Sequence, residues 1–271
     1  MNSIQNIHGY INSMSTTLPD KCWWLDKIPD TIDTIVDYGC AQGDLGVYIN
    51  EVCPNRFKYI GIDNSPEMIM LAFSNHRSYL FGRDSKFYPD IFDIEDKCDT
   101  SRAILVLNSV IHEILTYLPE EQNVPLFRKI FNSGFCAIAI RDMYMPNLTN
   151  NFWRNINAVR SSQYRHMWQE YNNYWHGKME QRCKGLWCNE QDIALVEFLM
   201  KYRYRDNWER EMREAYFWRW YVNILPAYID NYGIVYDRGF SIPFICDRVM
   251  HDFGIRIDGM HTHRKMLFAH L

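Results

Sequence analysis

The residues best suited to chemistry lie where short apolar runs of the sequence end. The run TIVDYG leads into the turn Gly39–Gly43, where small residues let the backbone approach a ligand closely. The next apolar run ends at Asp63, 20 residues beyond Gly43, and an acid at a strand tip can accept both hydroxyls of a ribose. Ser65 and Pro66 then suit the cap and first turn of a helix. This order predicts a cradle for a nucleotide-containing ligand.

The elements that must position these residues alternate between strand and helix patterns, which predicts an α/β fold with a parallel sheet. The predicted strands lie at about 34–38, 58–62, 86–89, 103–107 and 135–140, and the predicted helices at about 44–52, 66–74 and 120–132.

These features together resemble the class I S-adenosylmethionine-dependent methyltransferases. The first motif of that family reads roughly acid-x-Gly-Cys-Gly-x-Gly, and its second strand ends in an acid. The chain departs from the motif at Ala41, a residue small enough to permit close approach. The resemblance covers about residues 31–142 and 240–271. It implies a Rossmann-like sheet, S-adenosyl-L-methionine as cofactor, and methyl transfer as the reaction.

The resemblance also implies roles for individual residues. Asp37, Gly39 and Gly43 would contact the methionine end of the cofactor, and Asp63 the ribose. An acid after the third strand would lie near the adenine amine, and the end of the fourth strand would contact both cofactor and acceptor. The full expected cofactor set is Asp37, Gly39, Cys40, Ala41, Gly43, Asp63, Asn64, Asp90, Asp93, Asn108 and Ser109.

The predicted catalytic residues, His112 and Glu113, follow the fourth strand. Methyl transfer needs a general base only when the attacking atom still carries a proton late in the reaction, as a hydroxyl does. His112 is the candidate base, and Glu113 would orient it or bind an acceptor amine. The alternative is that both residues belong to the packing of a helix.

The chain is expected to have four parts: an N-terminal helical segment (1–30), the cofactor-binding core (31–142), a helical and aromatic-rich insert that covers the acceptor as a lid (143–235), and C-terminal elements that complete the sheet (236–271). The clearest helix of the insert is predicted over 204–222. A helix over 242–253 and strands at 254–257 and 265–269 are expected after it.

Charge is uneven along the chain. The net charge is −4 overall, −7 over residues 1–150 and +3 over residues 151–220. The basic stretch interleaves tyrosines and tryptophans with Arg154, Arg160, Arg165, Arg182, Lys184, Arg203 and Arg205. Guanidinium groups bind phosphates and aromatic rings stack on bases, which favours a nucleotide-containing acceptor, with RNA as the leading interpretation. A small anionic acceptor is the alternative, because the pI is near 6.1. The expected acceptor-binding residues are Arg141, Tyr144, His263 and Arg264.

Other classes are disfavoured by what the sequence lacks. No apolar run reaches the roughly 18–20 residues that cross a bilayer, so a cytoplasmic protein without membrane association is expected. There is no CxxC pair, and a metal is not expected, although Cys183 and Cys188 lie near His176. The GxGxxG loop of nicotinamide-dependent enzymes is absent. A catalytically silent cofactor-binding protein remains the main competitor from another class.

Overall fold

The computed structural model describes residues 17–79, 85–91, 94, 97–144, 152–178, 190–216 and 220–271. These divide into two compact units. The sheet unit consists of the described residues of three segments, 8–142, 225–237 and 265–271. The helical unit consists of those of 143–224 and 238–264. Among the helices that the structure describes, none has the length and apolar character needed to span a membrane.

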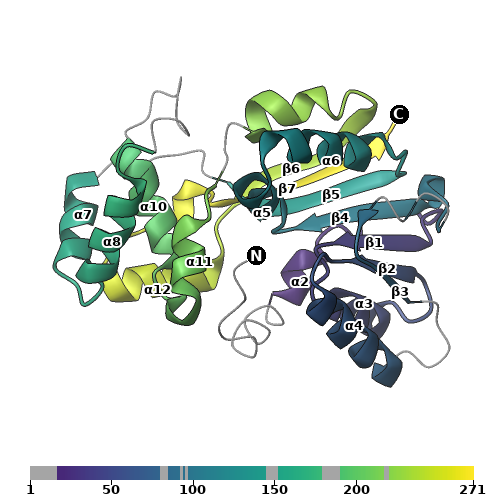
Figure 1. Cartoon of the computed structure of the whole chain (residues 1–271), viewed down its shortest axis with the longest axis horizontal. Helices are drawn as coiled ribbons and strands as arrows, with labels where there is room; N and C mark the ends of the chain where they lie inside the picture. Colours follow the sequence, from purple (N-terminus) through teal and green to yellow (C-terminus); the bar gives the residue numbers. More distant parts are fainter. Residues whose placement is uncertain are drawn as a thin grey trace. The chain divides into compact units, whose positions relative to one another are not determined.

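A mixed seven-stranded sheet is the central element, with strand order β3-β2-β1-β4-β5-β7-β6 (Figure 1). Its strands are β1 (Thr34–Tyr38), β2 (Lys58–Ile62), β3 (Lys86–Tyr88), β4 (Ala103–Asn108), β5 (Ala137–Met143), β6 (Tyr232–Phe240) and β7 (His263–His270). The first five pair in parallel. The amide of His270 donates to the carbonyl of Cys136 at 3.0 Å, and that of Leu271 to Asn231 at 3.1 Å, so β7 runs antiparallel between β5 and β6.

The central strands are buried along almost their whole length, as is typical of parallel sheets covered on both faces. The register pairs Tyr38 with Ile62 on one side and with Leu107 on the other. Asn108 pairs with Arg141. The carboxyl ends of β1, β2, β4 and β5 therefore meet at one edge of the sheet, where ligands bind in such folds.

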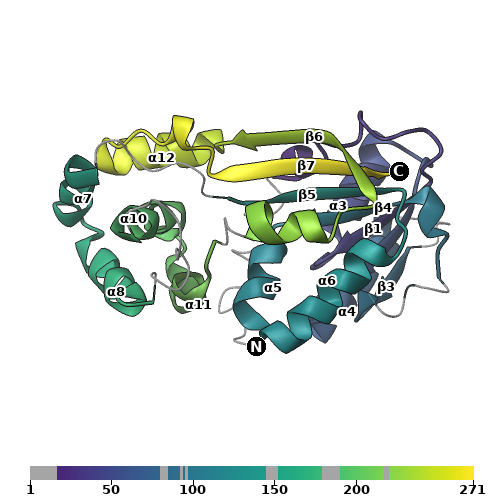
Figure 2. The same ribbon diagram turned by 90° about the horizontal axis from the view of Figure 1, so that it is seen from above.

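Helices flank this sheet (Figures 1 and 2). They are α2 (Leu18–Lys21), α3 (Asp44–Val52), α4 (Pro66–Tyr79), α5 (Ile111–Tyr117) and α6 (Glu120–Asn132). The amide of Met68 donates to the Oγ of Ser65 at 3.3 Å, which confirms the predicted cap of α4. The strand predictions for the core agree with the structure to within three residues, whereas α5 was not predicted as a helix.

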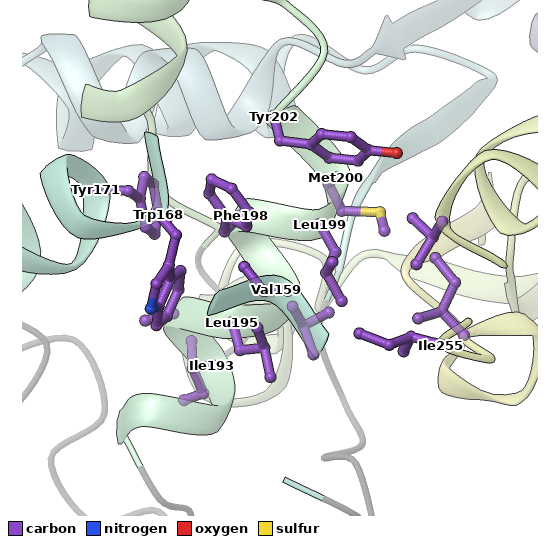
Figure 3. Packing of buried hydrophobic residues seen from close by; sticks show 14 of the residues in the cluster. Val159, Trp168, Tyr171, Ile193, Leu195, Phe198, Leu199, Met200, Tyr202 and Ile255 are labelled. Carbon is purple, nitrogen blue, oxygen red and sulfur yellow. The ribbon is translucent and has the colours of Figure 1, made fainter. Parts of the chain in front are cut away.

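A helical, aromatic-rich insert follows β5 and forms most of the helical unit. It contains α7 (Phe152–Arg160), α8 (Arg165–Trp175), α10 (Glu190–Lys201) and α11 (Trp208–Arg213), and α12 (Pro243–Phe253) belongs to the same unit. Trp168, Tyr171, Phe198 and Leu199 pack together inside it (Figure 3). The aromatic spacing of the insert thus builds a second hydrophobic core.

The prediction of one helix over 204–222 is wrong. α11 ends at Arg213, and Glu214 adopts an extended conformation with ψ of 137°. The buried ammonium of Lys201 hydrogen-bonds the carbonyls of Glu211, at 2.8 Å, and of Glu214. The end of α11 is thus bonded to a buried side chain of α10, a tertiary contact that the periodicity of the sequence does not report.

Two C-terminal predictions also change. Residues 254–257 form no strand, because Ile255 and Ile257 are buried in the core of the helical unit rather than paired in a sheet. β6 is not predicted, because it crosses the expected boundary at 235/236 and most of its side chains are partly or fully exposed, as is typical of an edge strand.

Candidate active site

The turn after β1 has the backbone conformation of a ligand cradle. Gly39 and Gly43 have φ of +77° and +79°, in the left-handed region. A Cβ at Gly39 would lie 2.9 Å from Cγ2 of Val110, and one at Gly43 would lie 2.7 Å from Nε2 of His76. Ala41 also has a left-handed φ, +47°. The departure from the family motif is therefore accommodated, at the cost of strain that glycine would avoid.

Asp63 joins the cradle to the end of β2. One carboxylate oxygen accepts the amide of Ala41 and the other accepts the amide of Ser65, both at 2.9 Å. The acid predicted to bind ribose therefore also braces the glycine turn. Because each carboxylate oxygen has two acceptor sites, these bonds leave capacity for hydroxyl groups.

Asp37, at the end of β1, is a buried carboxyl in the cradle wall. The hydroxyl of Tyr59 donates to its Oδ2 at 2.6 Å. Burial raises the pKa of Asp37 to about 6, although Tyr59 and the charge of Lys21 act in the opposite direction. Burial and the nearby Arg141 lower the pKa of Lys21 to about 8, with Asp37 opposing them. The same pocket is therefore lined by the carboxyl group of Asp37 and the amine of Lys21, whose charged forms have opposite signs.

One pocket is lined by Asp37, Lys21 and part of the turn after β1, whereas Gly43 and Asp63 do not line it. It is lined by Leu18, Lys21, Asp37, Gly39, Cys40, Ala41, Gln42, Asp44, Leu45, Met68 and Asn108. Asn108 is 9% exposed, and among the described residues neither the nitrogen nor the oxygen of its side-chain amide has a hydrogen-bond partner. A buried amide without partners is costly unless a ligand satisfies it. The pocket is thus built for a ligand with polar groups.

The residues predicted on the nucleoside side are more dispersed. Asn64 and Asp90 are exposed and do not line the pocket. Burial raises the pKa of Tyr38, and the charges of Asp90 and then Asp63 add to that rise, so the two acids lie near the same tyrosine. Asp93 lies outside the described residues.

His112 and Asp142 form a buried hydrogen-bonded pair at the carboxyl ends of β4 and β5. His112 Nδ1 lies 2.6 Å from Oδ1 of Asp142, and the amide of His112 donates to Oδ2 at 3.1 Å. The two side chains are only 3% and 1% exposed. Glu113, the predicted orienting group, is partly exposed in the first turn of α5. Asp142 therefore holds the His112 ring, and the role expected of Glu113 stays a prediction.

Of the expected acceptor residues, only Arg141 lies in the sheet unit. Its guanidinium donates from Nε to Asp20 at 2.7 Å and lies 3.3 Å from the Oγ of Ser109. In the helical unit, the guanidinium carbon of Arg264 lies 4.8 Å from the ring centroid of Tyr144, and His263 Nδ1 lies 2.9 Å from the Oγ1 of Thr262. Arg141 thus anchors α2, and all four residues remain predicted acceptor contacts.

Sequence reasoning missed several residues that the fold brings to the site: Leu18, Lys21, Gln42, Asp44, Leu45 and Met68 in the pocket wall, and Asp142 beside His112. An acid at the end of the fifth strand was the one available signal for Asp142. Lys21 carried no signal, because its place depends on contacts with residues far along the chain.

The donors and acceptors of the pocket fit the amino-acid end of S-adenosylmethionine. The cofactor carries an ammonium, a carboxylate and a sulfonium at that end, and the pocket offers the carboxylates of Asp37 and Asp44, the ammonium of Lys21 and the unsatisfied amide of Asn108. The close contacts beneath Gly39 and Gly43 explain why small residues are needed there.

Comparisons with known proteins identify the family of the chain. A family model described as a methyltransferase domain matches residues 30–215. No curated protein matches the chain. Among solved structures, the dimethyltransferase RosA from Streptomyces davawensis is 12% identical with a TM-score of 0.50, covering 97% of this chain and 56% of RosA, so the chain spans just over half of RosA's length. The plantazolicin methyltransferase BamL is 12% identical with a TM-score of 0.46, covering 95% of this chain and 83% of BamL. The chain therefore belongs to the methyltransferase-domain family and is a class I S-adenosylmethionine-dependent methyltransferase.

Proposed function

We propose that the acceptor is a hydroxyl group of a small molecule, with His112 as the general base and Asp142 as the residue that positions it. The observation that carries this proposal is the buried His112–Asp142 pair at the strand ends that flank the pocket wall. The pair favours a hydroxyl over an acceptor atom that needs no base. The burial of the aromatic residues in the helical unit favours the small-molecule alternative over RNA.

The pair selects one tautomer of the imidazole. An ionised carboxylate only accepts hydrogen bonds, so Nδ1 of His112 must carry a proton toward Asp142. The second bond, from the amide of His112 to the same carboxylate, fixes the position of Asp142. This arrangement makes Nε2 the basic nitrogen and stabilises the imidazolium that forms when it takes a proton.

The division of labour follows from this chemistry. Bound S-adenosylmethionine supplies a methyl group on a sulfonium, which is already a strong electrophile. The protein has to exclude water, orient the acceptor and remove its proton. His112 is 2% exposed, so a proton that it takes from an acceptor would be held away from bulk water.

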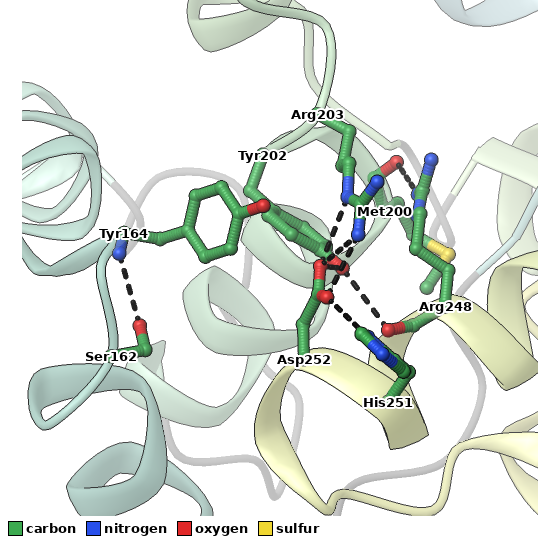
Figure 4. Close-up of polar contacts among 8 residues, drawn as sticks. All are labelled: Ser162, Tyr164, Met200, Tyr202, Arg203, Arg248, His251 and Asp252. Carbon is green, nitrogen blue, oxygen red and sulfur yellow. Dashed lines mark hydrogen bonds and ion pairs between the residues drawn. The ribbon is translucent and has the colours of Figure 1, made fainter.

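The helical unit offers little support for an RNA acceptor. The aromatic residues that motivated that interpretation are mostly core residues: Trp168 and Tyr171 are 2% and 0% exposed (Figure 3). Arg203 forms a two-point ion pair with Asp252, with donor–acceptor distances of 2.7–2.9 Å (Figure 4). Arg182 and Lys184 lie outside the described residues. Buried rings cannot stack on bases, and a paired guanidinium binds phosphate less readily.

RosA is named as a dimethyltransferase of 8-amino-8-demethyl-D-riboflavin, which gives a small-molecule precedent on this fold. An amine acceptor is the nearest alternative to a hydroxyl. An amine attacks through its lone pair and needs no base before the bond forms, so the two acceptors differ in their dependence on His112.

The test is release of S-adenosylhomocysteine in the presence of panels of phenols, alcohols, carboxylic acids and amines, and of total RNA. Wild-type protein is expected to turn over a small hydroxyl compound, and His112→Gln is expected to lower its kcat by about 10²–10⁴-fold. Methylation of RNA alone would refute the small-molecule proposal. Turnover of amines alone, unchanged in His112→Gln, would refute the role of His112.

We further propose that the insert selects the acceptor, as expected of an insertion that follows β5. Replacing it by a short linker is expected to preserve binding of S-adenosylhomocysteine and abolish methyl transfer. Retained turnover of the best acceptor would contradict this role.

A further inference from the structure

The N-terminal segment places a lysine in the wall of the cofactor pocket. Lys21, the last residue of α2, is 6% exposed and lines the pocket together with Asp37, Asp44 and Asn108. Leu18, from the first turn of the same helix, lines it as well. A lysine is almost never this buried unless an opposite charge faces it.

The position of α2 is fixed by contacts on both of its sides. Asp20 pairs with Arg141 Nη2 at 2.6 Å and with Lys265. Trp24, just after α2, is fully buried in the core of the sheet unit. Lys21 is therefore presented to the pocket by a held segment rather than by an exposed tail.

The wall of the pocket carries charges of both signs, the carboxylates of Asp37 and Asp44 and the ammonium of Lys21. Asp37 and Asp44 both stabilise the charged form of Lys21, while Arg141 and burial disfavour it. The methionine end of the cofactor is itself an opposed pair, with an ammonium and a carboxylate on one carbon. Asp37 suits the ammonium, and among the residues that line this pocket Lys21 is the cation that can receive the carboxylate.

We infer that Lys21 binds the carboxylate of the methionine moiety, so that α2 is part of the cofactor site and makes the protein discriminate against cofactor analogues that lack this carboxylate. The inference rests on the assigned cofactor and not on the proposed acceptor. The competing explanation is that Lys21 only neutralises Asp37, in which case it would affect every ligand of the pocket equally.

The experiment compares two ligands by calorimetry: S-adenosylhomocysteine, and its decarboxylated form, which keeps the amine and the nucleoside. Wild-type protein is expected to bind the first at least about tenfold more tightly. Lys21→Met is expected to weaken S-adenosylhomocysteine by about 10- to 100-fold and to change the decarboxylated ligand less than about threefold. Lys27→Met is the matched control, because Lys27 lies in the same segment, pairs with Asp26 and does not line the pocket.

Equal weakening of both ligands in Lys21→Met, or no weakening of either, would overturn the inference. If Lys21→Met does not fold, the wild-type ratio decides, since equal affinity for the two ligands excludes a carboxylate contact. If wild-type protein binds neither ligand, the cofactor assignment itself fails, which is a separate outcome.

Discussion

Replacing Asp63 by asparagine tests whether this acid holds the ribose or only braces the glycine turn. The carboxylate accepts the amides of Ala41 and Ser65, each at 2.9 Å. Asparagine has one acceptor oxygen, so its amide nitrogen would face one of these N–H groups. Loss of one hydrogen bond to a charged group corresponds to about 1.5–3 kcal/mol. The Kd of S-adenosylhomocysteine is thus expected to rise by about 10- to 150-fold if the cradle is disturbed.

The magnitude alone does not separate the two roles, so the assay uses a second ligand. Isothermal calorimetry with S-adenosylhomocysteine and its 2′-deoxy analogue, each on wild type and Asp63→Asn, forms a double-mutant cycle. If Asp63 accepts the 2′-hydroxyl, removing that hydroxyl costs wild type more than it costs the variant, by about 1 kcal/mol or more. Equal losses on both proteins would refute a ribose contact and leave Asp63 as a brace of the turn. Glu67→Gln makes the same change of charge on an exposed acid nearby and is expected to be neutral.

Three further predictions follow from the geometry. Asp142→Asn is expected to lower kcat on a hydroxyl acceptor by about 10²–10⁴-fold, because the asparagine amide no longer selects the tautomer of His112. The affinity for S-adenosylhomocysteine should stay unchanged. A loss of kcat below threefold would contradict the role of the His112–Asp142 pair. Burial raises the pKa of Asp37 to about 6, so protonation below that pH would remove the partner of the cofactor ammonium. The affinity for S-adenosylhomocysteine, measured by calorimetry, is therefore expected to fall about tenfold per pH unit below pH 6. Asp37→Asn should lack this pH dependence. Glu197→Ala orphans the hydroxyl of Tyr171 and the amide of Tyr216, which should lower the free energy of unfolding in urea by about 2–6 kcal/mol, with a smaller loss for Glu197→Gln.

Local pattern was enough to predict the core of the sheet. β1 and β2 were predicted to the residue, because β-branched and apolar runs bounded by turn residues have few other solutions in a buried parallel sheet. The turn Gly39–Gly43 and the acid at Asp63 were identified for the same reason, since both depend on a strand that ends at a known place.

The errors arise where contacts distant in sequence decide the outcome. The helix predicted over 204–222 satisfies the amphipathic period, but α11 ends at Arg213, where the buried ammonium of Lys201 bonds the carbonyls of Glu211 and Glu214. Asp20 and Arg141 are 121 residues apart, and their contact is what places Lys21 in the pocket. No local pattern reports a pairing of this kind, so the sequence predicts only those members of the candidate cofactor site that follow directly on a strand.

The cofactor cradle is held by buried side chains that need not themselves touch the ligand. Nε2 of His76 lies 2.9 Å from the carbonyl of Gly43, and because a carbonyl only accepts, this nitrogen carries the proton while Nδ1 accepts from Ser85 at 3.0 Å. Burial lowers the pKa of His76, which keeps the ring neutral in this tautomer. Tyr59 stacks on the His76 ring and donates to Asp37, so one aromatic pair fixes both ends of the turn.

A turn that is already in place loses little conformational entropy when the cofactor binds. Part of the affinity for the cofactor therefore resides in residues beneath the cradle, and substitutions at His76 or Tyr59 should weaken binding even though neither residue lines the pocket.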